Sequence, residues 1–282
     1  IEAEQLEEHG YAPFRMSTVF SEDESIEGKL DAILSDSLLD GAMTGVSIRH
    51  AETGEQLYGH DEDVRLRPAS NMKLLTAIAA LETLGEDYTF STELRTDGQV
   101  RGKVLHGDLY LVGKGDPTLL WDDFVDFAKQ LKAQGIEKIR GNIVGDDTWY
   151  DDERLSPTLI WSDQQYYYGS EISALTVSPN EDYDTGTVIV EVSPANQVGD
   201  KPDVTVIPEN KTIQIVNEAT TGEKGSTREV NVNRKRGTNT LVIDGSIPLE
   251  GSMTRVWRSV WEPTNYTLDV FQHALASEGV QL

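Results

Sequence analysis

Ser70 and Lys73 lie three residues apart in the segment Pro68-Ala69-Ser70-Asn71-Met72-Lys73, and their types suit nucleophilic chemistry. A serine hydroxyl is a poor nucleophile near neutral pH, so it needs a nearby base and a site for the developing oxyanion. On a helix, positions three apart share one face. A lysine acts as a base only where desolvation or a like charge favours its neutral form. The residues after Lys73 offer desolvation, because they are mostly apolar: Leu74, Leu75, Ala77, Ile78, Ala79, Ala80 and Leu81.

The same residues also fit an ordinary helix start. In that interpretation Ser70 caps the helix, Lys73 is solvated and the apolar residues simply pack. Ser-x-x-Lys alone favours the ordinary helix start by roughly three to one, because so short a motif occurs often by chance. The surrounding sequence has to decide between the two interpretations.

The composition excludes several classes of partner. The 282 residues include 49 Asp and Glu against 24 Lys and Arg, a formal charge of −25. Nucleic acids and anionic membrane surfaces are therefore disfavoured as partners. The acidity fits a secreted or cell-envelope protein adapted to salty or alkaline surroundings, or equally a surface that only confers solubility.

No cofactor, metal or transmembrane segment is expected. The absence of cysteine excludes disulfides, thiolate metal sites and a thiol nucleophile. No His-Glu-x-x-His motif appears, and no apolar run approaches about 18 residues. The five histidines are scattered: His9, His50, His60, His106 and His273.

Periodicity predicts the elements around the Ser70 segment. Residues 1–22 are polar and acidic and are expected to form a loosely held tail. Helical spacing of apolar residues covers about 23–39, and two strands at 45–50 and 56–59 form a hairpin-like pair. The helix carrying Lys73 runs from about 70 to 84, with Gly85 as its C-terminal cap.

Beyond residue 85, predicted strands first alternate with a helix, and short strands then dominate. Strands are predicted at 90–95, 108–112 and 139–144, with a helix between the last two, which reads as one α/β unit. Short strands separated by polar turns predict an all-β body, at 188–192, 204–207, 213–216, 230–232 and 240–243. A final helix is predicted over 266–278.

Whole phrases of the sequence resemble one enzyme family. They include Arg67-Pro68-Ala69-Ser70 running into Lys73-Leu74-Leu75-Thr76-Ala77, Gly107-Asp108-Leu109-Tyr110-Leu111, Gly113-Lys114-Gly115-Asp116-Pro117, Gly145-Asp146-Asp147-Thr148-Trp149 and Ile172-Ser173-Ala174-Leu175-Thr176. From about residue 25 to 282 the chain is similar to the D-alanyl-D-alanine carboxypeptidases with a long insertion, the class C low-molecular-mass penicillin-binding proteins of the Bacillus type.

The resemblance implies a multi-domain α+β fold of the α/β class. Residues 23–85 would be the N-terminal part of a serine β-lactamase/DD-peptidase-like catalytic domain. Residues 86–172, continued at 256–282, would form an inserted α/β domain, and 173–255 a nested all-β domain. The family also implies a function: Ser70 as the nucleophile of an acyl-enzyme and Lys73 as its base. The expected substrates are peptidoglycan stem peptides, with DD-endopeptidase activity as well, and β-lactams as inhibitors.

The chain departs from the family in its further motifs. No Lys-Thr-Gly occurs, because Lys211-Thr212 is followed by Ile213. Ser178-Pro179-Asn180 fits Ser-x-Asn in letters but sits in the insertion, and its residues favour a turn. We therefore expect that a C-terminal part, in this chain or as another chain, completes the active site, and that residues 1–282 alone are silent. The alternative is a non-catalytic module that binds wall polymer or a partner chain. A class A β-lactamase is disfavoured because that family lacks the long insertion.

An aromatic and acidic stretch, Trp161-Ser162-Asp163 with Tyr166-Tyr167-Tyr168-Gly169, is a further candidate site. The resemblance implies that it borders the active-site cleft and that Asp163 pairs with the ammonium end of a diaminopimelate side chain. The alternative is an insertion surface packed on neighbouring loops. Gly113-Lys114-Gly115-Asp116 lacks a phosphate-loop pattern, and Asp146, Asp147, Asp151 and Asp152 lack EF-hand spacing, so turns and helix caps are favoured there.

Overall fold

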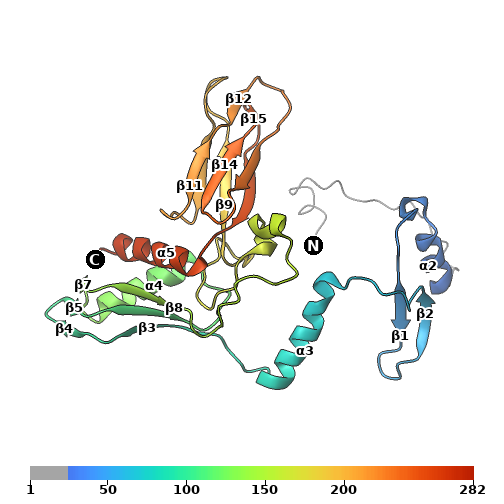
Figure 1. The fold of residues 1–282 in the computed structure, drawn as a ribbon, viewed down its shortest axis with the longest axis horizontal. Coiled ribbons are helices and arrows are strands. Elements are labelled where there is room, and N and C mark those ends of the chain that lie inside the picture. Colours follow the sequence, from blue (N-terminus) through green and yellow to red (C-terminus); the bar gives the residue numbers. More distant parts are fainter. Residues whose placement is uncertain (1–24) are drawn as a thin grey trace. The chain divides into compact units, whose positions relative to one another are not determined.

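A computed structural model describes residues 25–282, and Figure 1 shows its ribbon. Contacts divide the chain after Asp87 into two units, which are described separately. The acidic tail predicted for residues 1–22 lies outside the described residues. Within residues 25–282 no helix combines the length and apolarity that crossing a membrane requires.

Residues 25–87 of the first unit contain two helices, a hairpin and two short 3₁₀ turns. Its elements are α2 (Ile26–Leu34), η1 (Ser37–Leu39), β1 (Val46–Arg49), β2 (Gln56–His60), η2 (Ala69–Asn71) and α3 (Met72–Leu84). Ser25 caps α2 by accepting from the Gly28 N–H, and Gly85 ends α3 with a positive φ of 82°. The helix predicted to reach residue 39 stops at Leu34, because Asp36 caps a separate turn there.

Apolar residues of the first unit are uncovered. Neither α2 nor α3 has a buried residue, and Leu74 on α3 is 66% exposed. A helix that is apolar on several faces normally packs against other protein. The described part of this unit therefore has helices but no core of its own.

The second unit begins with a kinked three-stranded ribbon. Three passages of the chain run along this ribbon, and each passage is divided into two strands. The first contains β3 (Thr92–Thr96) and β4 (Gln99–Arg101), and the second contains β5 (Val104–His106) and β6 (Leu109–Gly113). The third contains β7 (Lys138–Arg140) and β8 (Ile143–Asp146). They pair in the orders β3-β6-β8 and β4-β5-β7. The single strand predicted for 139–144 is therefore wrong, because each passage is interrupted at the kink.

Glycines and one aspartate build that kink. The backbones at Gly98, Gly107 and Gly141 approach so closely that a Cβ on any of them would overlap main-chain atoms. Asp108 bridges two passages: its Oδ1 accepts from the Asn142 N–H at 2.7 Å and the Asn142 Nδ2 at 3.0 Å. Gly107 and Asp108 belong to a phrase that resembles the enzyme family, so that phrase includes residues with a structural role.

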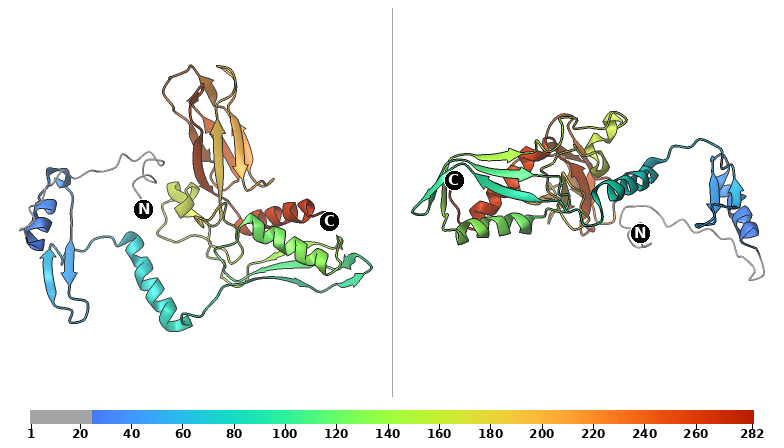
Figure 2. Two further views of the ribbon diagram at one scale, coloured as in Figure 1. Left: turned by 180° about the vertical axis from the view of Figure 1, so that it is seen from behind. Right: turned by 90° about the horizontal axis from the view of Figure 1, so that it is seen from below.

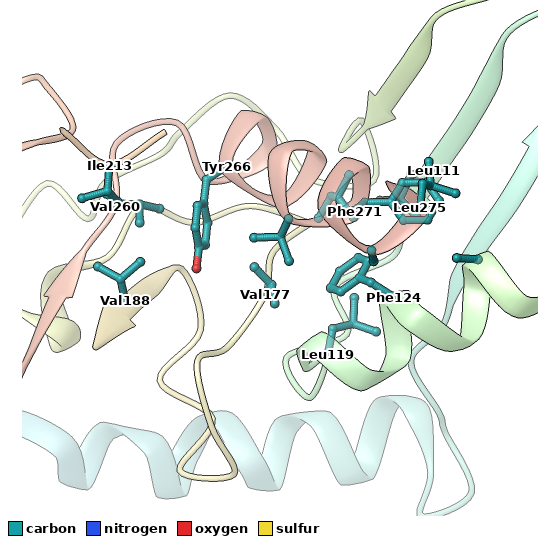
Figure 3. Packing of buried hydrophobic residues seen from close by; sticks show 14 of the residues in the cluster. Leu111, Leu119, Phe124, Val177, Val188, Ile213, Val260, Tyr266, Phe271 and Leu275 are labelled. Carbon is teal, nitrogen blue, oxygen red and sulfur yellow. The ribbon is translucent and has the colours of Figure 1, made fainter. Parts of the chain in front are cut away.

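Two helices cover one face of the ribbon (Figure 2). They are α4 (Trp121–Ala133) and α5 (Pro263–Ser277). Phe124 of α4 and Phe271 of α5 lie 6.1 Å apart between ring centroids and are fully buried with Leu111 and Leu275 (Figure 3). This cluster continues through Val177 into the next group of strands, so the second unit has one connected apolar core.

The remaining strands form the nested all-β part. They are β9 (Thr187–Ser193), β10 (Asp203–Ile207), β11 (Gln214–Asn217), β12 (Thr220–Gly222), β13 (Asn231–Arg234), β14 (Thr240–Asp244), β15 (Ser246–Pro248) and β16 (Thr254–Ser259). β10 and β16 flank β9, while β11 and β13 flank β14. The sequence prediction missed β12, β15 and β16, the first two because each has only three residues.

A polar cluster fixes the long segment between β8 and β9. Arg154 Nη2 donates to Asp147 Oδ2 at 2.6 Å, and Thr264 Oγ1 donates to the same oxygen. Thr264 Oγ1 also lies 2.9 Å from Ser173 Oγ. Burial, the largest single effect, raises the pKa of Asp147, but the bonds from Thr264 and Arg154 outweigh it and hold that pKa below 3.8. The charged form of Asp147 therefore stabilises this segment.

Gly141→Ala is expected to destabilise the protein by about 1–3 kcal/mol, because its Cβ would meet the Gly107 backbone, which cannot move aside. Urea unfolding measures the change. Gly222→Ala is the matched control: its Cβ would meet mainly the side chain of Ser226, so a change within about 0.5 kcal/mol is expected. Equal effects of the two substitutions would refute the kink argument.

Asp147→Asn is expected to destabilise the protein at pH 7. Because the folded pKa of Asp147 is lowered, its contribution is present above 3.8 and disappears as pH falls through the folded value. The gap between parent and variant should therefore shrink below pH 3.8 in urea titrations. Asp126→Asn removes an exposed i,i+3 pair with Lys129 and should have little effect. A gap that is constant with pH contradicts this account.

Candidate active site

Ser70 and Lys73 lie together in the first unit. Ser70 is on η2 and Lys73 on the first turn of α3, and Lys73 Nζ donates to Ser70 Oγ at 2.8 Å. The side chain of Ser70 makes no capping bond to the helix. The geometry is thus that of a hydroxyl held by an amine and not that of an ordinary helix cap.

The backbone before Ser70 is strained. Ala69 has φ 44°, in the left-handed region that a residue with a Cβ seldom adopts. Such strain costs roughly 1–3 kcal/mol and is found often at functional sites. It lies between Pro68 and α3, and Ser70 at the helix start is exposed, as are all residues from 61 to 90. Within residues 25–87, Lys73 is the one side chain that bonds to the Ser70 hydroxyl.

Asp163 lies in the second unit, on η3 (Trp161–Gln165). Its Oδ1 accepts from Ser162 Oγ at 3.3 Å, and it forms no ion pair with another described residue. Gly169, at the end of η4 (Tyr167–Gly169), packs so tightly on the Asp163 carbonyl that a side chain there would overlap it. The segment is therefore folded back on itself and presents a partly exposed carboxylate.

Aromatic rings surround Asp163 in the sequence and are largely exposed. Trp161 is 65% exposed and Tyr168 59%. Tyr168 stacks on Tyr166 with centroids 5.6 Å apart and meets Tyr167 edge-on at 5.2 Å. These contacts order the three tyrosine rings against each other and leave Tyr167 and Tyr168 largely exposed.

Two arginines of the nested part hold this segment in place. Arg234 Nη2 donates to the Gln164 carbonyl, at 2.5 Å, and Arg258 lies over the Tyr166 ring at 5.2 Å. Ser259 Oγ donates to the same Gln164 carbonyl. Sequence reasoning missed these residues. The one available signal was the run Arg234-Lys235-Arg236, which is unusual in so acidic a chain.

The remaining motifs have structural tasks. Ser178 is buried and donates to the Pro117 carbonyl at 3.2 Å, and Asn180 binds Asp182 in a turn, so neither is part of a catalytic Ser-x-Asn within this unit. Gly115 has φ 85° and packs against Tyr150. Asp146 caps a turn by accepting from the Thr148 N–H at 3.0 Å. No metal-binding cluster is found among residues 25–282.

Comparisons with known proteins indicate the same enzyme family as the sequence phrases do. A D-alanyl-D-alanine carboxypeptidase of an Actinomadura species is 43% identical over 253 residues, which cover 89% of this chain and 46% of that protein. Penicillin binding protein 4 (dacB) from Haemophilus influenzae has a similar crystal structure, with a TM-score of 0.70 at 21% identity, covering 84% of this chain and 51% of that one. A second crystal structure of that protein, complexed with a novel β-lactam, has a TM-score of 0.62, likewise at 21% identity, with coverage of 84% and 50%.

The chain spans about half the length of the relatives it matches. The model of the D-Ala-D-Ala carboxypeptidase 3 (S13) family matches residues 26–282, nearly all of the described chain. The mixed α/β architecture agrees with that of the solved structures. This chain therefore belongs to the D-Ala-D-Ala carboxypeptidase 3 (S13) family.

Proposed function

We propose that the protein is a serine D-alanyl-D-alanine carboxypeptidase that acts on peptidoglycan stem peptides. The observation that carries the proposal is the 2.8 Å hydrogen bond between Lys73 Nζ and Ser70 Oγ in a segment matched by the family model. Ser70 Oγ attacks the carbonyl carbon between two D-alanines, and its proton passes to Lys73. The C–N bond breaks, D-alanine leaves with a proton, and water then hydrolyses the ester on Ser70.

The same chemistry extends to two related reactions. A cross-link between D-alanine and diaminopimelate presents the same kind of amide, so we also propose DD-endopeptidase activity. A β-lactam ring opens by the same attack and leaves a persistent acyl group on Ser70, as the β-lactam complex of the Haemophilus influenzae protein suggests. Peptidoglycan is outside the cytoplasm, so the protein would act in the cell envelope or after secretion.

Asp163 is proposed to bind the stem peptide. Its carboxylate is partly exposed and has no ion-pair partner among the described residues. An ammonium group is the natural partner for such a carboxylate, and the diaminopimelate side chain ends in one.

Further protein is proposed to complete the site. The apolar side chains of α3 are more than half exposed at Leu74, Leu75 and Ile78, and burying them would stabilise any covering segment. A C-terminal polypeptide, in the same chain or as a partner, would cover them and supply Ser-x-Asn and Lys-Thr-Gly groups. The second candidate function is a silent module that binds wall polymer or a partner chain, favoured by the same uncovered surface.

Lys73→Arg is expected to abolish acylation of Ser70, because arginine keeps its proton while preserving charge and approximate size. Labelling with fluorescent penicillin, read on a denaturing gel, measures acylation in the protein with its proposed C-terminal part. A loss of at least about 100-fold in labelling rate is expected for removal of a general base. Lys29→Arg, on α2, is the control and should label as the parent does. Parental labelling by Lys73→Arg refutes the role of Lys73, and no labelling of the parent favours the silent module.

Asp163→Asn is expected to raise KM for a stem peptide ending in diaminopimelate by about tenfold, the cost of one charge-assisted bond, with kcat nearly unchanged. The same variant should hydrolyse a peptide with an uncharged side chain at that position as the parent does. Asp182→Asn, which also removes one exposed carboxylate in the same unit, is the matched control. Equal losses on both peptides would contradict a contact with the ammonium group.

A further inference from the structure

A small pocket lies between η3 and the end of β13. It is lined by Trp161, Ser162, Gln164, Gln165, Arg234 and Arg236, and its volume is about 210 Å³. Asp163 does not line it. The pocket belongs wholly to the second unit and is built by two segments about 70 residues apart in the sequence, which the Arg234 hydrogen bonds hold together.

The pocket is positively charged although the chain carries a formal charge of −25. Within the described residues no ion pair joins Arg234, Arg236 or Arg258 to a carboxylate. Arg234 is only 9% exposed, and its buried Nε has no hydrogen-bond partner in the described structure. Removing a cation from water without a counter-charge is costly. An anion in the adjoining pocket would supply that counter-charge.

The carboxylate of Glu171 does not fill this need. Glu171 attracts Arg234 electrostatically but lies beyond ion-pair distance, and its Oε2 is engaged by the Glu262 N–H at 2.7 Å. Burial, the larger effect, still lowers the pKa of Arg234. The guanidinium is thus held by two carbonyl oxygens and a hydroxyl without neutralisation of its charge.

The other lining groups suit a sugar. Trp161 is 65% exposed, and the Arg236 guanidinium lies 5.7 Å from its ring centroid. An exposed indole with an arginine over its ring offers a flat apolar surface next to a cation. Gln164, Gln165 and the Ser162 hydroxyl add groups that bind hydroxyls and amides. The volume lies below the ~300 Å³ at which drug-sized pockets begin, so it fits a single ring.

We propose that this pocket binds an anionic saccharide, with the sugar ring against Trp161 and its carboxylate facing the charges of Arg234 and Arg236. The site would hold an acidic carbohydrate of the cell wall. It does not rest on the acyl-transfer chemistry proposed above, because neither Ser70 nor Lys73 takes part in it.

Calorimetric titration of the protein with three probes tests the proposal. N-acetylmuramic acid carries both a ring and a carboxylate, N-acetylglucosamine lacks the carboxylate, and inorganic phosphate lacks the ring. N-acetylmuramic acid is expected to bind at least about tenfold more tightly than either, because each of the others loses one set of contacts. Its binding should also weaken as salt is raised.

Variants locate the binding. Arg236→Gln should weaken N-acetylmuramic acid binding about tenfold or more, and Trp161→Ala should weaken it while leaving phosphate binding unchanged. Arg101→Gln removes an exposed arginine elsewhere in the unit and should change nothing. Circular dichroism confirms folding, and Trp161→Phe replaces Trp161→Ala if the latter fails to fold. Three outcomes would each overturn the proposal: no binding of N-acetylmuramic acid by the parent protein, binding by Arg236→Gln as tight as that of the parent, or phosphate binding as tight as that of the sugar acid. Penicillin labelling at Ser70 is independent of all these outcomes.

Discussion

The guanidinium of Arg234 joins stretches of chain that are far apart in the sequence. Its Nη1 donates to the Thr238 carbonyl at 3.0 Å, its Nη2 reaches the Gln164 carbonyl and Ser259 Oγ, and its plane lies near the Trp261 ring. A buried cation has to find acceptors, so each of these segments must be in place before Arg234 can be buried. Arg234 therefore fixes η3 against the end of β16, together with Arg258 and Ser259.

Apolar packing stabilises one part of the second unit, and polar bonds stabilise another. The Phe124 and Phe271 cluster holds the two helices on the kinked ribbon through non-directional packing. The segment from Asp147 to Ser173 contributes little to that cluster. It is held instead by an internal bond between Arg154 and Asp147 and by directional bonds to Thr264 and Arg234. Directional bonds fix orientation, which is what a surface that recognises a ligand requires. The described part of the first unit has no buried helix residue, and polar bonds such as that from the Tyr58 hydroxyl to Asp31 Oδ1, at 2.6 Å, link its elements.

Much of this arrangement could be predicted from the sequence, for reasons that can be stated. The helix after Ser70 and its end at Gly85 follow from apolar periodicity and a glycine cap, and the Ser70 and Lys73 contact follows from their spacing. The kink at Gly141 could not be predicted, because it depends on the approach of Gly98 and Gly107 from other passages of chain. The tasks of Arg234 and Arg258 were missed for the same reason: their partners are about 25 to 95 residues away. The roles of Ser70, Lys73 and Asp163 stay predictions.

The chain enters and leaves the nested part at neighbouring residues. Thr187, the first residue of β9, is paired with Ser259, the last residue of β16, in an antiparallel register. Ends that lie side by side let a folded part be inserted into a chain without separating the segments that flank it. Thr187 and Ser259 are such ends, so the nested strands can differ in length or in their loops while the flanking segments keep their positions.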